Sequence, residues 1–257
     1  MKNLILLPLL FITISLSAQL KLHSHNDYLQ AVPLFTALDA KAFSIEADVF
    51  LVKGSLLVAH TFKERSSKKT LKTVYIEPIV RLFKKNNGKI SADNDYKPNL
   101  MIDIKEEGPL VLDELVKELS PLREFFDRSV NPNAVQVVIS GDRGPSSQWK
   151  NYPSYIMFDG RPNEEYTSDA IDKIAFISDN YFNYIVTKNN RGDSVKIKAL
   201  AQKAHSLNKL LRLWGSPDTE DVWKLMDESN VDIINTDKPA ACREFFEKWK
   251  GKKVSGE

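Results

Sequence analysis

The sequence contains few of the residues that stabilise or identify certain other folds, such as the cysteines of disulfide-linked folds and the glycines of nucleotide-binding turns. It has one cysteine, Cys242, so no disulfide can form within the chain and the fold must depend on its own packing. It has ten glycines and contains neither a GxGxxG turn nor a Walker-type loop, which weighs weakly against a nucleotide-binding open sheet. The formal net charge is only +2, so we expect no nucleic-acid partner.

The N-terminal apolar run is too short to cross a membrane. It extends from Leu4 to Leu16, whereas a spanning helix needs roughly 20 residues. A lysine precedes the run and small residues, ending with Ala18, follow it, which is the pattern of a secretory signal peptide. We therefore expect a cleaved signal peptide over residues 1–18, a single domain over residues 19–257, and a secreted or periplasmic protein. A retained N-terminal anchor is the alternative.

Short apolar runs alternate with longer amphipathic ones along the rest of the chain. The short runs are rich in β-branched and aromatic residues, which predicts strands over residues 20–25, 43–49, 99–105, 134–140, 154–159, 174–179, 209–214 and 231–235. The amphipathic runs predict helices over residues 33–41, 74–86, 109–126, 166–172, 194–207, 218–228 and 238–250. Eight strands alternating with helices predict a single (βα)8 TIM barrel, with a doubly wound sheet as the alternative.

Polar residues occur in pairs at the ends of five predicted strands. Residues i and i+2 of a strand share one face, and barrel active sites lie at the carboxyl ends of the strands. The pairs are His23/His25, Glu46/Asp48, Asp103/Lys105, Arg212/Trp214 and Asn235/Asp237. Because burying so many polar side chains for structure alone is costly, a functional site is favoured over a structural ion network.

A third histidine is expected to join these pairs through a hairpin. Lys53-Gly54-Ser55 stands between two apolar runs and predicts a tight turn after the second strand. The returning strand would place His60 beside Asp48. His205 lies in a predicted helix and is expected at the surface.

Three carboxylates are expected together on neighbouring strands. Glu46, Asp48 and Asp103 offer hard oxygen ligands, which suit Mg²⁺ or Ca²⁺ rather than zinc. The alternative is a carboxylate cluster neutralised by Lys105. The HxH pattern also occurs in zinc-dependent amidohydrolase barrels, but these need histidines at later strand ends, which this chain lacks.

The phrases HSHNDY, SIEADVFLVKGSLLVAH, LMIDIK, LRLWGSPDTEDVW and VDIINTDKP follow one another along nearly the whole mature chain. Their order resembles the phosphatidylinositol-specific phospholipase C and glycerophosphodiester phosphodiesterase superfamily, and within it the branch called altered inheritance of mitochondria protein 6-like. The resemblance implies a βα barrel that cleaves phosphodiesters with two histidines and a divalent metal. It matches His23 and His60 to the catalytic histidines, and it matches the metal ligands to Glu46, Asp48 and Asp103.

The sequence also departs from the glycerophosphodiesterases, since HSH replaces their HRG and their PENT phrase is missing. We expect a metal-dependent phosphoric diester hydrolase that acts on glycerophosphodiesters or phospholipid head groups. The residues expected to contact substrate are His25, Asn26, Lys105, Arg143 and Trp214. The alternatives are a lyase that forms a cyclic phosphate and a non-catalytic barrel that binds head groups. We expect a monomer with at most peripheral membrane contact; the basic stretch from Lys63 to Lys72 could attract anionic head groups or be a solvated loop.

Overall fold

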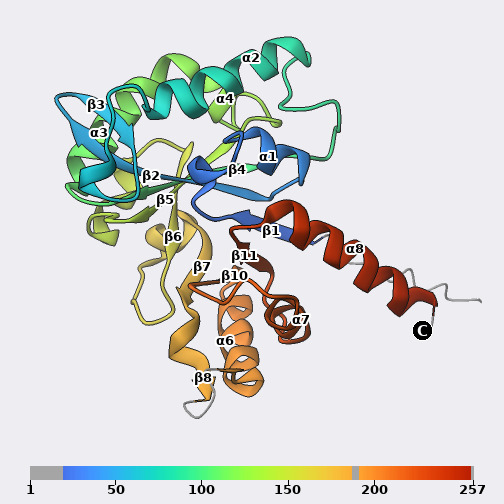
Figure 1. Cartoon of the computed structure of the whole chain (residues 1–257). Helices are drawn as coiled ribbons and strands as arrows, with labels where there is room; N and C mark the ends of the chain where they lie inside the picture. The colour runs from blue at the N-terminus through green and yellow to red at the C-terminus, as the bar shows by residue number, and fades with distance from the viewer. Residues whose placement is uncertain (1–19, 187–190, 256–257) are drawn as a thin grey trace, which may run out of the picture.

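Eight parallel strands close into a barrel at the centre of the molecule (Figure 1). The computed structural model describes residues 20–186 and 191–255, so the expected signal peptide lies outside the described residues. The barrel strands are β1 (Lys21–Ser24), β2 (Ser44–Val52), β4 (Asn99–Ile104), β5 (Gln136–Gly141), β6 (Ile156–Gly160), β7 (Ile174–Asn180), β10 (Leu210–Trp214) and β11 (Ile233–Thr236). Strand β1 closes the barrel by pairing with both β2 and β11. The predicted (βα)8 barrel is confirmed.

Helices cover the outside of the barrel (Figure 1). They are α1 (Phe35–Asp39), α2 (Glu77–Lys85), α3 (Gly108–Leu119), α4 (Arg123–Phe126), α5 (Ser168–Asp172), α6 (Ser194–Ser206), α7 (Glu220–Glu228) and α8 (Pro239–Ser255). The helix predicted over residues 109–126 is divided into α3 and α4. A 3₁₀ turn, Ser120–Leu122, separates them, because Pro121 lacks the amide hydrogen that would continue the α-helix.

A hairpin extends β2 beyond the barrel wall, as predicted. Strand β3 (Ser55–Val58) runs antiparallel to β2. Lys53 and Gly54 form the turn with positive φ angles of 49° and 75°. The amide of Ala59 then donates to the carbonyl of Asp48 at 3.2 Å, which brings the next residue, His60, to the side of Asp48. A second antiparallel pair, β8 (Ile185–Val186) and β9 (Arg191–Gly192), was not predicted.

The inside of the barrel changes from apolar to polar along its axis. One layer is formed by four buried apolar side chains: Met101, Val138, Phe176 and Ile233. Two residues further along the same strands, on the same inward face, stand Asp103, Ser140, Ser178 and Asn235. Since side chains alternate along a strand, the apolar layer closes the amino end of the barrel and the polar layer opens at its carboxyl end, as in other TIM barrels.

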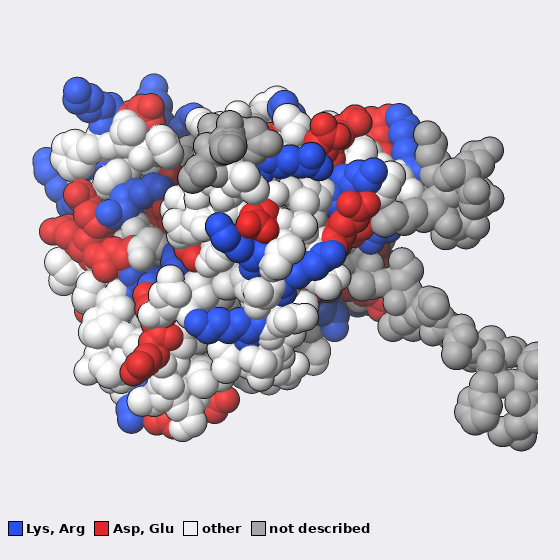
Figure 2. All heavy atoms as spheres, turned by 90° about the horizontal axis from the view of Figure 1, so that it is seen from below, with Lys and Arg blue, Asp and Glu red and all other residues white. Residues whose placement is uncertain are grey.

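Charges of both signs are mixed on the surface. On the face shown in Figure 2, Lys and Arg side chains are interspersed with Asp and Glu, which agrees with a net charge close to zero. Within the described ranges, no helix combines the length and the apolar character needed to cross a bilayer.

Candidate active site at the barrel mouth

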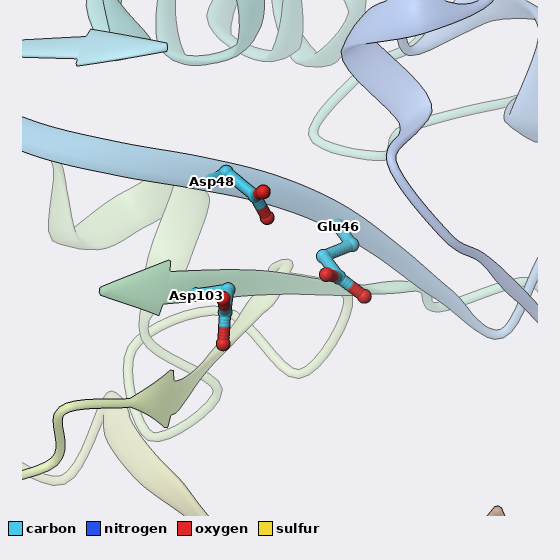
Figure 3. Close-up of side chains that lie close together, drawn as sticks. All are labelled: Glu46, Asp48 and Asp103. Atoms are coloured by element: carbon cyan, nitrogen blue, oxygen red, sulfur yellow. The ribbon is translucent and has the colours of Figure 1, made fainter. Parts of the chain in front are cut away.

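Three carboxylates from two neighbouring strands lie together at the carboxyl end of the barrel. Glu46 and Asp48 come from β2, and Asp103 comes from β4, paired in register with Asp48. Figure 3 shows the three side chains lying close together, and one oxygen of each lies within 4.8 Å of the others. Burial, reinforced by the charge of Glu46, raises the pKa of both Asp48 and Asp103. Carboxylates this close need a cation between them if all are to ionise.

Lys105 supplies the nearest positive charge. Its Nζ lies 2.6 Å from Oδ2 of Asp48 and 2.5 Å from Oδ2 of Asp103. Burial acts to lower the pKa of Lys105, but the charges of Asp103 and Asp48 outweigh it and raise the pKa. The ammonium group therefore stays protonated at neutral pH and offsets part of the carboxylate charge.

One carboxylate oxygen of the triad has no hydrogen-bond partner in the described part of the protein. Oδ2 of Asp48 accepts a hydrogen bond from the Tyr28 hydroxyl at 2.8 Å and lies 3.1 Å from Nδ1 of His60. Oδ1 of Asp48 is buried and has no hydrogen-bond partner, which is unusual for a carboxylate oxygen. Three carboxylates form the hard donor set that Mg²⁺ and Ca²⁺ prefer, so the residues present fit such an ion. Within the described residues this is the one group of three or more potential ligands.

His23 lies beneath the carboxylates and is closed off from solvent. Its side chain is 0% exposed, with Nε2 at 2.5 Å from Oε2 of Glu46 and at 2.6 Å from Nη1 of Arg212. Burial, followed by the positive charge of Arg212, holds the pKa of His23 well below its usual value. The ring is therefore neutral, and its contacts tie Glu46 to Arg212.

His25, two residues further along, lies nearer the solvent. Its Nδ1 is 2.7 Å from Oδ1 of Asp237, in the turn after β11. Burial acts to lower the pKa of His25, but the hydrogen bond to Asp237 and the charges of Glu46 and Asp237 outweigh it and raise the pKa. Because the pair uses Nδ1, Nε2 is the ring atom available for proton transfer.

Two guanidinium groups line the same cavity as the carboxylates, and one buried aspartate anchors both. Oδ2 of Asp159 lies 2.8 Å from Nη1 of Arg161 and 3.4 Å from Nη2 of Arg212. Burial acts to raise the pKa of Asp159, but the charges of Arg161 and Arg212 outweigh it and lower the pKa. Beside them stands Trp214, whose buried Nε1 has no hydrogen-bond partner.

These groups surround a cavity of about 280 Å³. It is lined by His25, Asn26, Glu46, His60, Asp103, Lys105, Ser140, Gly141, Arg161, Arg212 and Trp214. The cavity therefore combines carboxylate ligands, two histidines and three permanent cations in a volume suited to a small anionic group.

Most of the residues predicted from the sequence meet at this cavity. Asp48 lies just behind the lining, in contact with His60 and Lys105. Two further predicted site residues do not line it either. His23 is buried below, and Arg143 is turned aside, with Nη2 at 2.5 Å from Glu164 and Nη1 donating to the carbonyl of Asp159.

Sequence reasoning missed Tyr28 and Arg161. Arg161 stands two residues after Asp159 at the end of β6, so the same i, i+2 rule that selected the other pairs could have found it. Tyr28 lies in a loop, where strand periodicity carries no information; only its position within HSHNDY could have drawn attention to it.

Solved structures with this fold include several phosphodiesterases. A glycerophosphodiester phosphodiesterase from Parabacteroides distasonis superposes with a TM-score of 0.57 at 15% identity, covering 90% of this chain and 98% of that one. A Ca²⁺-dependent phosphatidylinositol-specific phospholipase C from Streptomyces antibioticus gives a TM-score of 0.53 at 9% identity, covering 88% and 95%. These likenesses show that the chain shares the barrel fold of these enzymes.

Sequence comparison places the chain more narrowly. The model of the AIM6-like phosphodiesterase domain family matches residues 15–151, more than half of the chain, and the chain belongs to that family. An altered inheritance of mitochondria protein 6 homolog from Arthroderma benhamiae is 26% identical over 265 residues, covering 87% of this chain and 83% of the relative. The protein of that name from Eremothecium gossypii is 28% identical over 269 residues, covering 88% and 69%.

Proposed function

We propose that this protein is a metal-dependent phosphoric diester hydrolase that acts on glycerophosphodiesters or phospholipid head groups. The observation that carries the proposal is the cavity, where carboxylates, cations and two histidines converge within about 280 Å³. A phosphodiester is anionic and resists attack, so its cleavage needs positive charge at the phosphate and groups that transfer protons on either side. Each of these requirements has a candidate residue in the cavity.

Glu46, Asp48 and Asp103 would hold one divalent cation, Mg²⁺ or Ca²⁺. When bound, such an ion offsets negative charge on the phosphate oxygens. The unpartnered, buried oxygen Oδ1 of Asp48 supports this assignment. The Ca²⁺ dependence of the Streptomyces antibioticus phospholipase C supports Ca²⁺ as one candidate.

Lys105, Arg161 and Arg212 would bind the phosphate from the protein side. All three line the cavity, and their own carboxylate partners hold them in place before substrate arrives. Preorganised charges of this kind are more effective than mobile ones, because they need not reorient as charge develops. A guanidinium group also presents paired donors to phosphate oxygens.

We assign proton transfer to His25 and His60, the two histidines that line the cavity. The raised pKa of His25 favours its protonated form, which suits donation to the leaving alkoxide. His60 points Nδ1 toward Asp48, so Nε2 is available to accept a proton from the nucleophile. The resemblance described in the sequence analysis implied the first catalytic role for His23 instead, but the burial of His23 and its contacts with Glu46 and Arg212 favour a structural role.

The substrate class follows from the size and charge of the cavity. A volume of about 280 Å³ suits a phosphate with a small polar substituent, and an Oleispira antarctica phosphodiesterase of this fold (TM-score 0.51, 10% identity) is described in complex with sn-glycerol-3-phosphate. Attack by water gives hydrolysis, whereas attack by a substrate hydroxyl gives a cyclic phosphate. The N-terminal pattern supports export as the location of this activity.

Turnover of a defined set of diesters tests the proposal. Purified protein is assayed on bis(p-nitrophenyl) phosphate, glycerophosphocholine, phosphatidylinositol and sphingomyelin, with Mg²⁺, with Ca²⁺ and with excess chelator. We expect metal-dependent cleavage of at least one natural diester, and ³¹P NMR of the product distinguishes a monoester from a cyclic phosphate. Absence of cleavage with either metal, by protein that binds glycerol phosphate, would favour the non-catalytic barrel.

A further inference from the structure

Exposed apolar side chains gather at the cavity end of the barrel. Ten large hydrophobic side chains are exposed among the described residues. Eight lie in connections from the carboxyl end of a barrel strand to the next helix, or in the first turn of that helix: Leu29, Val32, Phe35, Phe62, Leu110, Phe182, Val186 and Val195. The other two, Val130 and Leu207, precede strands and lie at the opposite end. An apolar bias of this kind marks an interaction surface.

Two of these connections border the cavity directly. The loop after β1 carries His25 in the cavity lining, and the connection after β3 carries His60. The Tyr28 hydroxyl lies 3.4 Å from Nδ1 of His60, so the two segments meet at the mouth. Their exposed apolar side chains, which we call the mouth rim, are Leu29, Val32, Phe35 and Phe62.

The loop after β1 is held so that its apolar side chains face solvent. Its one buried carboxylate, Asp27, accepts hydrogen bonds from the amide of Leu34 at 2.6 Å and from the hydroxyl of Tyr75 at 2.9 Å. Leu29, between these anchors, is nevertheless 67% exposed. Its exposure therefore belongs to an ordered loop.

The connection after β3 is ordered as well. Thr61 and Glu64 form a reciprocal capping box around a 3₁₀ turn, and Phe62 inside that turn is 58% exposed. Its ring contacts Phe50 edge-on and carries the guanidinium of Arg65 above it. An aromatic ring is thus presented to solvent beside a cation.

Positive charge surrounds this ring. The segment from Thr61 to Lys69, which we call the basic segment, contains four basic residues and one acidic residue. Lys63, Lys68 and Lys69 are exposed. Anionic lipid attracts basic side chains near its surface, while aromatic and aliphatic side chains insert at the boundary between head groups and acyl chains.

We propose that the mouth rim and the basic segment dock the barrel on an anionic lipid surface. The apolar side chains rise from separate loops around an opening, with lysines between them, which suits a bilayer better than one continuous protein face. Docking there would turn the cavity toward head-group phosphodiesters. The docking surface stands on these observations alone, whereas its use in delivering substrate rests on the proposed function.

Cosedimentation with vesicles tests the surface without any turnover. The full-length protein is mixed with vesicles of phosphatidylcholine alone or with phosphatidylglycerol, and binding is compared among folded variants. We expect tighter binding to the anionic vesicles. Phe62→Ser should weaken it about tenfold or more, and Lys68→Glu with Lys69→Glu should weaken it at least about 25-fold, since each lysine contributes about fivefold.

Matched controls lie at the opposite end of the barrel. Val130→Ser and the double change Lys84→Glu with Lys85→Glu alter exposed side chains of the same kinds and should leave vesicle binding within about twofold. All variants keep the same N-terminus, so any contribution from it cancels. Equal binding by rim and control variants, or no preference for anionic vesicles, overturns the proposal.

Size-exclusion chromatography with light scattering tests whether a second copy of this chain, rather than a lipid surface, covers the mouth rim. A dimer that the rim changes convert to monomer, without loss of vesicle binding, would make the rim a contact between copies and overturn lipid docking. Failure here is also distinct from failure of the proposed activity. Cleavage of a soluble diester without vesicle binding overturns only the docking surface, and vesicle binding without cleavage overturns only the activity.

Discussion

The different environments of His23 and His25 make the sharpest test of the site. In our proposal His25 transfers a proton, while His23 holds the buried side chains of Glu46 and Arg212. Replacing each ring should therefore damage a different property. We expect His25→Ala to lose turnover and His23→Ala to lose stability.

The magnitudes follow from the burial of each ring. Loss of a general acid lowers kcat by about 10²–10⁴-fold. The His25 side chain is 29% exposed and its partner Asp237 is 61% exposed; exposed pairs of this kind contribute less than about 1 kcal/mol to stability. His25→Ala should thus unfold almost like the parent protein.

His23→Ala removes a fully buried ring. It leaves Oε2 of Glu46 and Nη1 of Arg212 without the nitrogen that lies 2.5–2.6 Å from each, and these charged groups have little access to water. Leaving a buried polar group without a partner costs about 1–3 kcal/mol. Leaving a buried charged group without a partner costs up to several kcal/mol. We expect the free energy of unfolding to fall by about 2–4 kcal/mol.

A third variant keeps the comparison clear if His23→Ala does not fold. His23→Gln retains a polar side chain that can reach one of the two partners, but it removes a titratable ring. The assay is kcat and KM on bis(p-nitrophenyl) phosphate at saturating metal, beside urea unfolding of each variant. We expect folded His23→Gln to keep kcat within about tenfold of the parent. A folded His23→Gln that loses 10²-fold or more, beside a His25→Ala of near-normal turnover, would show that His23 is the catalytic histidine.

Three further predictions concern the metal, the pH profile and the first loop. Asp48→Asn keeps the shape of the ligand but removes its charge, so half-maximal activity should need at least about tenfold more Mg²⁺ or Ca²⁺; full activity in excess chelator would refute the metal site. Asp237 helps to raise the pKa of His25 against the effect of burial, so Asp237→Asn should lower that pKa and move the alkaline limb of kcat, where protonated His25 is lost, to lower pH. An unmoved limb would mean that His25 is not the acid. Asp27→Ala leaves a backbone amide and a tyrosine hydroxyl unpaired and should lower the free energy of unfolding by about 2–3 kcal/mol, measured in urea, whereas the exposed Asp39→Ala should cost less than about 0.5 kcal/mol.

The order of strands and helices could be predicted from local pattern alone. The stretch NLMIDI became β4 (Asn99–Ile104), with five of its six residues buried, because a barrel strand is covered on both faces and therefore reads as a nearly continuous apolar run. The hairpin was equally local, since Lys53 and Gly54 need only the backbone angles of a tight turn. Such features depend on neighbours in the chain, which a sequence displays directly.

The short pair β8–β9 and the division between α3 and α4 were not predicted. Strands of two residues are too short to show a period. The break at Pro121 was readable from the residue, but amphipathicity on both sides of it favoured a single helix.

The gathering of the carboxylates was determined by the sequence as well. Glu46 and Asp48 share a face through the period of two, and parallel pairing of neighbouring strands places Asp103 level with Asp48. The metal-ligand triad is therefore a consequence of strand order and register.

Only the tertiary structure decided which side chains of the site are buried and which are accessible to solvent. His23 and His25 have the same spacing and the same inward face, so the sequence treats them alike. Only closure of the barrel brings Arg212, 189 residues away, over His23, and only the turn after β11 brings Asp237 to His25. In the same way Glu164 draws Arg143 away from the cavity. Which ring is sealed and which is accessible depends on side chains from distant strands, because burial and charge are set by neighbours in space rather than by spacing along one strand.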